Sequence, residues 1–358
     1  MDMSGSRTLW RAALLAAVAV VGVAGTSIPA SATPSLQVIA DHLKNPRKIT
    51  VQWNGTILVA EAGEGLPGCA AGQTCAAPTG AVYRVQGSTQ GRVVTGLPSA
   101  ATISTTPGSP VQAMGPVQVF PDYYNGGYTV INGYDGTTGT RAALGADGAK
   151  LGTIERTSDG SVVADLTAYE TQFSPDGRGP ESNPYGFAPS GSDWLAIDAA
   201  GNDVVKVSGS TLSTRALLPD NQTANGPVQS VPTAIVPGQN GTYYIADMGG
   251  MQPGASRIWK LTPGQQPQVL ASGLTNLIDL TTDNSGNLVA LSLTTGFGAN
   301  GPLPGALFRV DPCSGAVNEI PSGGLLNMPT GVAVGPQGQI YISNNGSTTD
   351  GQLVRLRS

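Results

Sequence analysis

Short apolar runs separated by turns recur along the chain from residue 35 to the end. Six of these runs follow a turn that contains glycine or aspartate, and they are rich in Val, Ile, Leu and Tyr, residues that favour strands. The runs are GTILVAE at 55, GYTVIN at 127, DWLAID at 193, GTYYIAD at 241, GNLVALS at 286 and GQIYISN at 338. No segment after residue 32 has a convincing helical period of useful length. The pattern therefore predicts a protein built from short strands.

Each run is the second strand of a repeated unit. An opening motif precedes it, with an apolar residue three positions after an anchor that is usually proline, as in NPRKI at 45. Two further strand-like segments follow it, such as SRIWKL at 256 and PQVLASGL at 267. A four-stranded unit repeated about every 40 to 50 residues is typical of a propeller blade. The anchors are Pro46, Pro116, Pro184, Pro232, Leu277 and Pro329, spaced by 70, 68, 48, 45 and 52 residues, so the first two units contain insertions.

The sixth unit ends without a fourth strand, and the missing strand is found at the other end of the domain. SLQVIADHL (35–43) aligns with PQVLASGL (267–274) and also leads into an opening motif. Such a strand would close the ring and remove its open edges. We therefore predict an all-β fold for residues 33–358, a six-bladed β-propeller of four-stranded antiparallel blades closed by its N-terminal strand. In that strand the expected apolar contacts come from Leu36, Val38 and Ile39.

Residues 1–32 have the features of a cleavable signal peptide. Arg7 and Arg11 give a positive start, the stretch 12–25 is apolar and uncharged, and Ala30 to Ala32 supplies a cleavage site of small residues. The apolar stretch is shorter than the roughly 20 residues that span a bilayer. We therefore expect an exported, secreted or extracytoplasmic protein with no membrane contact after cleavage. An uncut membrane anchor is the alternative.

Charge and composition limit the classes of partner. Without residues 1–32 the chain has 16 Lys and Arg against 22 Asp and Glu, a formal charge of −6, which argues against nucleic acid as a partner. His42 is the only histidine, so His-based triads and multi-histidine metal sites are nearly excluded. Because His42 takes the turn position that Gly96 and Gly273 hold in other units, we expect it at the surface.

Two of the three cysteines are close together in a loop. Cys69 and Cys75 lie in the segment GCAAGQTCAAP, and in an oxidising compartment such a pair most simply forms a local disulfide. Cys313 has no partner, and we expect a buried free thiol, with an exposed reactive thiol as the alternative.

Every second strand ends on a side chain that carries a polar oxygen. In a propeller these strand ends lie near one face of the disc, so six such groups would surround the mouth of the central channel. A binding site for a polar ligand or a hard cation is one hypothesis, because calcium takes six to eight oxygen ligands. The alternative is that the same side chains satisfy backbone groups in the adjoining turns. The candidate ligands are Glu61, Asn132, Asp198, Asp247 and Asn344, with Ser292 at the sixth position.

The residue that follows the anchor provides a second set at the same face. It is Arg47, Tyr185, Thr233 or Thr330 in the units where it is polar. Arg47 is the only cation among them, so it is a candidate for anion binding. A solvated or internally paired arginine is the alternative.

Several stretches resemble the ScyD/ScyE family, secreted propeller-like proteins named after the scytonemin gene cluster. The most specific is RAALGADGAKLGTIERTSDGSVVADLTAYETQFSPDGRGPESNPYGF (141–187), and the resemblance extends through QSVPTAI (229–235), SGLTNLIDL (272–280) and PTGVAVGPQGQIYISNNG (329–346). It implies an extracytoplasmic β-propeller of poorly defined activity. The resemblance implies no established catalytic residues that could be transferred to this chain.

Two functions follow as hypotheses. The first is a non-catalytic binding or scaffold protein, a monomer with a small molecule or a protein as partner, because no catalytic set is recognisable. The second is a calcium-dependent hydrolase of the lactonase type, in which a metal in the channel polarises a carbonyl. In that case Glu61, Asp198 and Asp247 are the expected metal ligands.

Overall fold

The computed structural model describes residues 33–106, 109, 111–224 and 226–357. The signal peptide expected at residues 1–32 lies outside them. Within the described ranges, no helix has the length and apolar character needed to cross a membrane.

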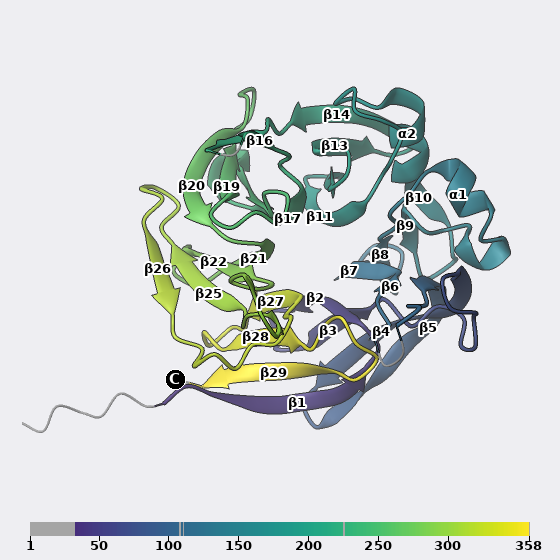
Figure 1. Ribbon diagram of the computed structural model, residues 1–358, viewed down its shortest axis with the longest axis horizontal. Helices are drawn as coiled ribbons and strands as arrows, with labels where there is room; N and C mark the ends of the chain where they lie inside the picture. Colours follow the sequence, from purple (N-terminus) through teal and green to yellow (C-terminus); the bar gives the residue numbers. More distant parts are fainter. Residues whose placement is uncertain (1–32, 107–108, 110, 225, 358) are drawn as a thin grey trace, which may run out of the picture. The chain divides into compact units, whose positions relative to one another are not determined.

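The unit Thr33–Ser358 is a ring of six sheets, each with at least four antiparallel strands. In five of the sheets the first strand in the sequence lies nearest the centre of the ring, and later strands lie progressively further out (Figure 1). The sixth sheet has the strand Gly331–Val334 innermost and the N-terminal strand Ser35–Leu43 outermost. This confirms the predicted six-bladed β-propeller.

The first three blades follow one another along the chain. Blade one contains β2 (Pro46–Val51), β3 (Ile57–Glu61), β4 (Thr74–Gln86) and β5 (Thr89–Thr102), extended by β6 (Ala113–Met114). Blade two contains β7 (Pro116–Pro121), β8 (Tyr128–Asn132), β9 (Thr153–Arg156) and β10 (Val162–Asp165). Blade three contains β11 (Pro184–Ser190), β12 (Asp193–Asp198), β13 (Asp203–Ser208) and β14 (Thr211–Leu217).

The last three blades repeat the pattern, and the sixth takes its outer strand from the N-terminal side. Blade four contains β17 (Pro232–Pro237), β18 (Tyr243–Asp247), β19 (Ser256–Leu261) and β20 (Gln268–Leu274). Blade five contains β21 (Leu277–Thr282), β22 (Leu288–Ser292), β25 (Ala306–Val310) and β26 (Val317–Ile320). Blade six contains β27 (Gly331–Val334), β28 (Ile340–Asn344), β29 (Gly351–Arg357) and β1 (Ser35–Leu43).

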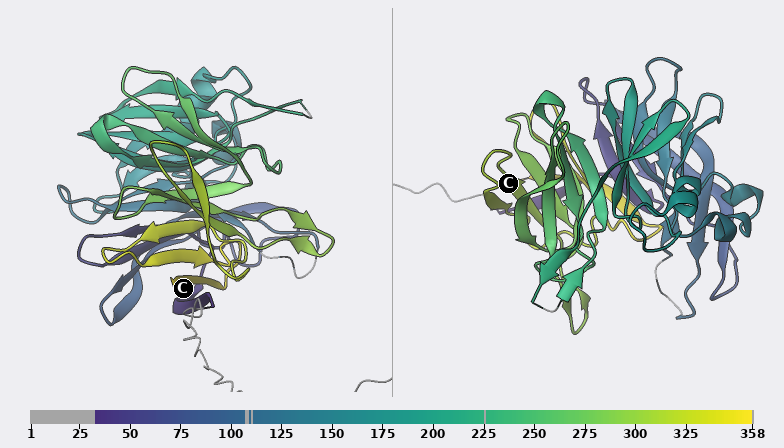
Figure 2. Two further views of the ribbon diagram at one scale, coloured as in Figure 1. Left: turned by 90° about the vertical axis from the view of Figure 1, so that its left-hand side faces the viewer. Right: turned by 90° about the horizontal axis from the view of Figure 1, so that it is seen from above.

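The connections carry small additional elements. Two hairpins, β15–β16 (Asn221–Thr223 and Gly226–Val228) and β23–β24 (Phe297–Gly298 and Gly301–Pro302), project from the same face of the ring (Figure 2). Two short helices, α1 (Thr138–Ala142) and α2 (Leu166–Phe173), lie beside blade two, where the sequence pattern predicts none. They are too short to show a helical period, and side-chain caps begin them: Asp165 accepts a hydrogen bond from the Ala168 N–H at the start of α2. The 3₁₀ turns are Ala146–Gly148 and Gln239–Gly241.

The hydrophobic core lies between the blades. One cluster of buried apolar side chains fills each of the six junctions, as where Ile197 of blade three meets Ile245 of blade four. Successive residues of a second strand face opposite neighbours: Ile197 packs towards blade four and Ala196 towards blade two. This is the period of two that a strand imposes, and it explains why these strands are apolar at nearly every position.

Strand β1 closes the ring as predicted, pairing antiparallel with β29 from Ser35 opposite Arg357 to Leu43 opposite Gly351. His42 is exposed and has a positive φ of 54°, and Gly273 and Gly96 also have positive φ values, which confirms the shared turn position. The expectation for Val38 is wrong: the register shifts after it, and its side chain is 48% exposed. Ala40 and Leu43 take over the inward packing.

Cys69 and Cys75 form the predicted disulfide. The expected burial of Cys313 is wrong, because its thiol is free and exposed. It lies in the turn between β25 and β26, where the Asp311 carboxylate accepts hydrogen bonds from the N–H groups of Cys313 and Ser314. A residue in such a turn lies at the surface, so the side chain at position 313 cannot pack into the hydrophobic core.

Removing the disulfide should cost only a modest part of the stability. Because Cys69 and Cys75 are only six positions apart in the sequence, the double variant C69S/C75S should lose about 2 kcal/mol of unfolding free energy, measured by urea denaturation. Alkylation of the native protein without reductant should label Cys313 alone. Labelling of all three cysteines would contradict the bond.

Candidate functional site

The face at which the second strands end, called here the mouth face, carries the longest connections. Glu61 to Thr74, Asn132 to Thr153 and Ser292 to Ala306 are all bridged there, and they include the disulfide loop, α1 and the β23–β24 hairpin. The turns at the opposite face are shorter, as between Ser190 and Asp193. Elaborated loops on a rigid scaffold are where binding sites usually form, so the mouth face is the place to look for function.

The six polar residues predicted at the strand ends stand where expected. Each is the last residue of the second strand of its blade and is at most 5% exposed. They are Glu61 in β3, Asn132 in β8, Asp198 in β12, Asp247 in β18, Ser292 in β22 and Asn344 in β28.

These side chains bind the backbone of their own blade. The Lys44 N–H donates to Glu61 Oε1 at 2.7 Å, the Asn183 N–H to Asp198 Oδ1 at 2.6 Å, and the Asn327 N–H to Asn344 Oδ1 at 2.8 Å. In each case the donor lies just ahead of the first strand. At these three positions the strand-end side chain therefore holds the segment that precedes the first strand, which is the structural role that the sequence left open as an alternative. Asn132 differs, because its amide donates to Lys150 O and to Glu155 Oε1.

The carboxylates proposed as calcium ligands are not gathered. Glu61 faces Arg92 at 2.7 Å, and Asp247 faces Arg257 at 3.0 Å. Burial raises the pKa of Asp247, while hydrogen bonds from Ser230 and Trp259 and the Arg257 charge oppose that rise. In the part of the chain that the structure describes, no three His, Cys, Asp or Glu residues come together to hold a metal ion. The donor arrangement does not fit a channel calcium held by Glu61, Asp198 and Asp247.

Arg47, Tyr185 and Thr233, which follow their anchors, lie at irregularities of the first strands. In β11, for example, the pairing with β12 shifts between Pro184 and Gly186, and Tyr185 occupies the extra position. Thr233 and Thr330 use their hydroxyls to join neighbouring blades, donating to Leu277 O at 2.9 Å and to Pro46 O at 2.6 Å. Arg47 and Tyr185 remain as the larger polar side chains of this set.

A buried ion pair crosses the middle of the ring. Lys48 Nζ in β2 lies 2.6 Å from Asp279 Oδ1 in β21, and Asp279 Oδ2 accepts the Val332 N–H from the strand between them at 2.8 Å. Lys48 and Asp279 are 2% and 3% exposed. The Lys48 side chain reaches as far as β11, where a Cβ on Gly186 would be in ordinary van der Waals contact with Lys48 Cε at 3.4 Å. Side chains therefore fill the channel at this level.

Arg47 and Tyr185 lie one residue closer to the mouth. The guanidinium of Arg47 donates to Gly346 O at 2.9 Å and to Ala113 O at 2.7 Å, which leaves part of its five N–H groups unused. No carboxylate pairs with it among the described residues. Burial lowers the pKa of Arg47 and raises that of Tyr185, and the two groups interact electrostatically. Arg47 and Tyr185 together form a half-buried, positively charged surface on the mouth side of the Lys48–Asp279 ion pair.

Sequence reasoning missed Lys48 and Asp279 although a signal exists. Both occupy the same place in their opening motifs, NPRKI and NLIDL, two residues after the anchor. A ring brings equivalent positions of different repeats towards one axis, so opposite charges at one position indicate an ion pair across the channel. Other blades have small residues at that position, such as Gly186 and Ala234, which leave space in the channel for the two charged side chains.

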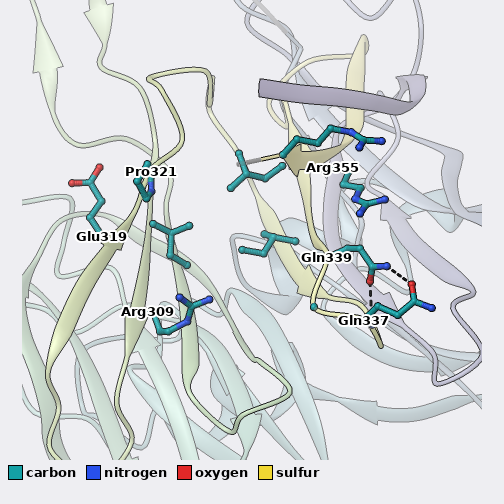
Figure 3. A pocket seen from close by; sticks show the side chains of 11 residues that line it. Arg309, Glu319, Pro321, Gln337, Gln339 and Arg355 are labelled. Carbon is teal, nitrogen blue, oxygen red and sulfur yellow. Dashed lines mark hydrogen bonds between the residues drawn. The ribbon is translucent and has the colours of Figure 1, made fainter. Parts of the chain in front are cut away.

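Two cavities lie away from the mouth. One of 480 Å³ opens between the outer strands of blades five and six, where Arg309 and Glu319 face Gln339 and Arg355 across a cleft (Figure 3). The other, of 790 Å³, lies at the face opposite the mouth and is rich in exposed aromatic rings. The most exposed of these are Trp53, Tyr123 and Tyr124, at 85%, 73% and 98%.

No family model matches the sequence, and no curated protein matches it either. Solved structures do resemble the fold. A luciferin-regenerating enzyme superposes with a TM-score of 0.50 at 10% identity, over 91% of this chain and 95% of that one.

Two other similar structures are a candidate gluconolactonase and the soluble aldose sugar dehydrogenase of Escherichia coli. The first has a TM-score of 0.48 at 11% identity, over 91% of this chain and 93% of its own. The second has a TM-score of 0.48 at 12% identity, over 91% and 99%. At such identities the likeness extends to the β-propeller fold and to nothing finer.

Proposed function

We propose that the protein binds a small carboxylate-bearing molecule at the mouth of its channel. The observation that carries the proposal is Arg47, a half-buried guanidinium with free N–H groups and no carboxylate partner in the described part of the chain. A planar guanidinium matches a carboxylate with two parallel hydrogen bonds.

The surroundings of Arg47 favour an anion over a neutral ligand. Burial lowers the pKa of Arg47, which means that its charge is costly to maintain there and that a bound anion would offset the cost. Burial also raises the pKa of Tyr185, so its hydroxyl keeps its proton and can donate to the same anion. Because the Lys48–Asp279 ion pair fills the channel just below, the ligand should be small.

A lactonase-like hydrolase is the second candidate, and the same arginine supports it. Opening a lactone produces a hydroxy acid, whose carboxylate Arg47 would hold as the product. The calcium-dependent form has no support from Glu61 and Asp247, because both face arginines. A hydrolase of this chain would therefore need a water activated by another group.

Replacing Arg47 tests both candidates. In R47M the affinity for a hydroxy acid such as gluconate, measured by isothermal titration calorimetry, should fall at least tenfold, as expected for a lost charge-assisted contact of about 1.5 to 3 kcal/mol. R215M is a matched control, because Arg215 also donates to carbonyl oxygens of a neighbouring blade, at Thr262 and Gln265. R215M should bind as the unaltered protein does.

The same proteins separate binding from catalysis. Turnover of gluconolactone by the unaltered protein, followed by titration of the released acid and lost in R47M, would select the hydrolase. Binding without turnover would select the binding protein. Equal carboxylate affinity in R47M and the unaltered chain would reject the site.

We also propose that the protein is exported and belongs with the ScyD/ScyE proteins. The Cys69–Cys75 disulfide supports an oxidising compartment, since such bonds are rare in the cytosol. The blade order supports the resemblance at the level of the fold. A small-molecule partner and a monomeric state are parts of the same proposal.

A further inference from the structure

Blade three contains a buried group of acids beyond the mouth residues. Asp198 ends β12 and Asp203 begins β13, and the two residues lie directly opposite each other at the end of this hairpin. Helix α2 places Glu170 against the connecting turn, where a Cβ on Gly201 would come within 2.8 Å of Glu170 Oε2. The three side chains are at most 1% exposed.

Two of these three carboxylates have no partner. Asp198 accepts hydrogen bonds from Ser182 Oγ and from the N–H groups of Asn183, Ala200 and Gly201. All four carboxylate oxygens of Glu170 and Asp203, in contrast, are buried without a hydrogen-bond partner. Buried charged groups in native proteins are ordinarily paired or bound to a metal.

Neighbouring negative charges make the burial of these unpartnered carboxylates still less favourable. Burial, followed by the negative charges of Asp198 and Asp176, raises the pKa of Glu170 to about 8. Burial raises the pKa of Asp203 well above its usual value. Among the neighbouring charges, that of Asp198 adds most to this rise. The basic residue of this region, Arg178, contacts Asp176 and Asp220 instead.

Other blades show what is missing here. The residue opposite Asp247 in blade four is Arg257, which pairs with it at 3.0 Å. In blade one Glu61 contacts Arg92. Blade three places an acid, Asp203, where blade four has its arginine, so two like charges lie directly opposite each other, an arrangement that destabilises a sheet.

We propose that Glu170 and Asp203 bind a divalent cation, calcium, between α2 and the turn that links β12 to β13. No three acids of the described residues form a metal-binding group by themselves, so the proposed ligands are the two unpartnered carboxylates alone. They supply up to four hard oxygen ligands, and water or backbone carbonyls would complete the six to eight that calcium takes. Zinc is a poor fit because the group has neither cysteine nor histidine. The ion would neutralise both acids and join the helix to the hairpin. This site is separate from Arg47 and independent of the proposed function.

The test begins with the unaltered protein. After chelator treatment, titration calorimetry with calcium chloride should show one ion bound per chain, and added calcium should raise the melting temperature by at least a few degrees. Absence of binding together with an unchanged melting temperature would overturn the proposal. It would mean that Glu170 and Asp203 are protonated.

Isosteric variants locate the ion. E170Q and D203N should each lose calcium binding and the calcium-dependent rise in melting temperature. D193N is the matched control, because Asp193 lies at the other end of β12 and pairs with Lys206 at the surface. D193N should bind calcium as the unaltered protein does. Full calcium binding by E170Q and D203N would place the ion elsewhere and refute the assignment.

Discussion

Deleting residues 35–43 is expected to destabilise the protein by at least about 4 kcal/mol and to promote aggregation. Strand β1 contributes Ala40 and Leu43, 4% and 0% exposed, to the cluster between blades six and one. Each buried leucine is worth about 1.5 to 3 kcal/mol, and the hydrogen bonds to β29 are lost at the same time. The deletion also exposes β29 as an edge strand, which can pair with another chain.

Chemical denaturation followed by fluorescence measures this effect. Removing only Thr33 and Pro34 should change little, because they precede the strand. Within β1, L43A should cost about 2 to 5 kcal/mol, whereas V38A should cost under about 1 kcal/mol because Val38 is half exposed. A nine-residue deletion that unfolds like the full domain would show that the N-terminal strand does not close the ring.

Replacing Lys48 with methionine is expected to cost about 3 to 5 kcal/mol, because it leaves the buried carboxylate of Asp279 without its cation. Burial already lowers the pKa of Lys48, and the contact with Asp279 acts against that shift. The pair also joins three first strands, through the Val332 N–H that Asp279 accepts. The lost unfolding free energy should therefore reflect weaker packing between blades one, five and six.

The double variant K48M/D279L separates the cost of an unpaired charge from the value of the pair. It should recover at least half of the loss, since an apolar replacement leaves no buried charge. A surface pair provides the comparison: K206M, which removes the contact with Asp193, should cost under about 1 kcal/mol. If K48M lost no more unfolding free energy than K206M in urea denaturation, the Lys48–Asp279 pair would not contribute to stability.

The repeat made the strands predictable. The six second strands end at the expected residues, from Glu61 in β3 to Asn344 in β28, and β1 spans 35–43 as the alignment requires. His42 was placed correctly from the turn glycines of other blades. These predictions succeed because each depends on a pattern that is local to one strand or turn and is repeated along the chain.

Side-chain partners were much less predictable. The sequence identified the strand-end acids but not that Glu61 and Asp247 would face arginines while Asp198 would face Asp203. Glu170 was missed because α2 is an eight-residue insertion outside the repeat. The burial expected of Cys313 was wrong, since a turn decides its exposure.

The sequence by itself determined the blade number, the strand order and the closing strand, because alternating apolar residues and turn signals act within a few positions of each other. Only the tertiary structure decided which charges meet. Lys48 and Asp279 are 231 residues apart, and their contact follows from the curvature of the ring, which brings six first strands around one axis. The pairing of Asp203 with Asp198, and the placing of Glu170 against their turn, likewise depend on how a helix packs on a hairpin. Local patterns fix strands, whereas the balance of buried charge is set by contacts across the fold.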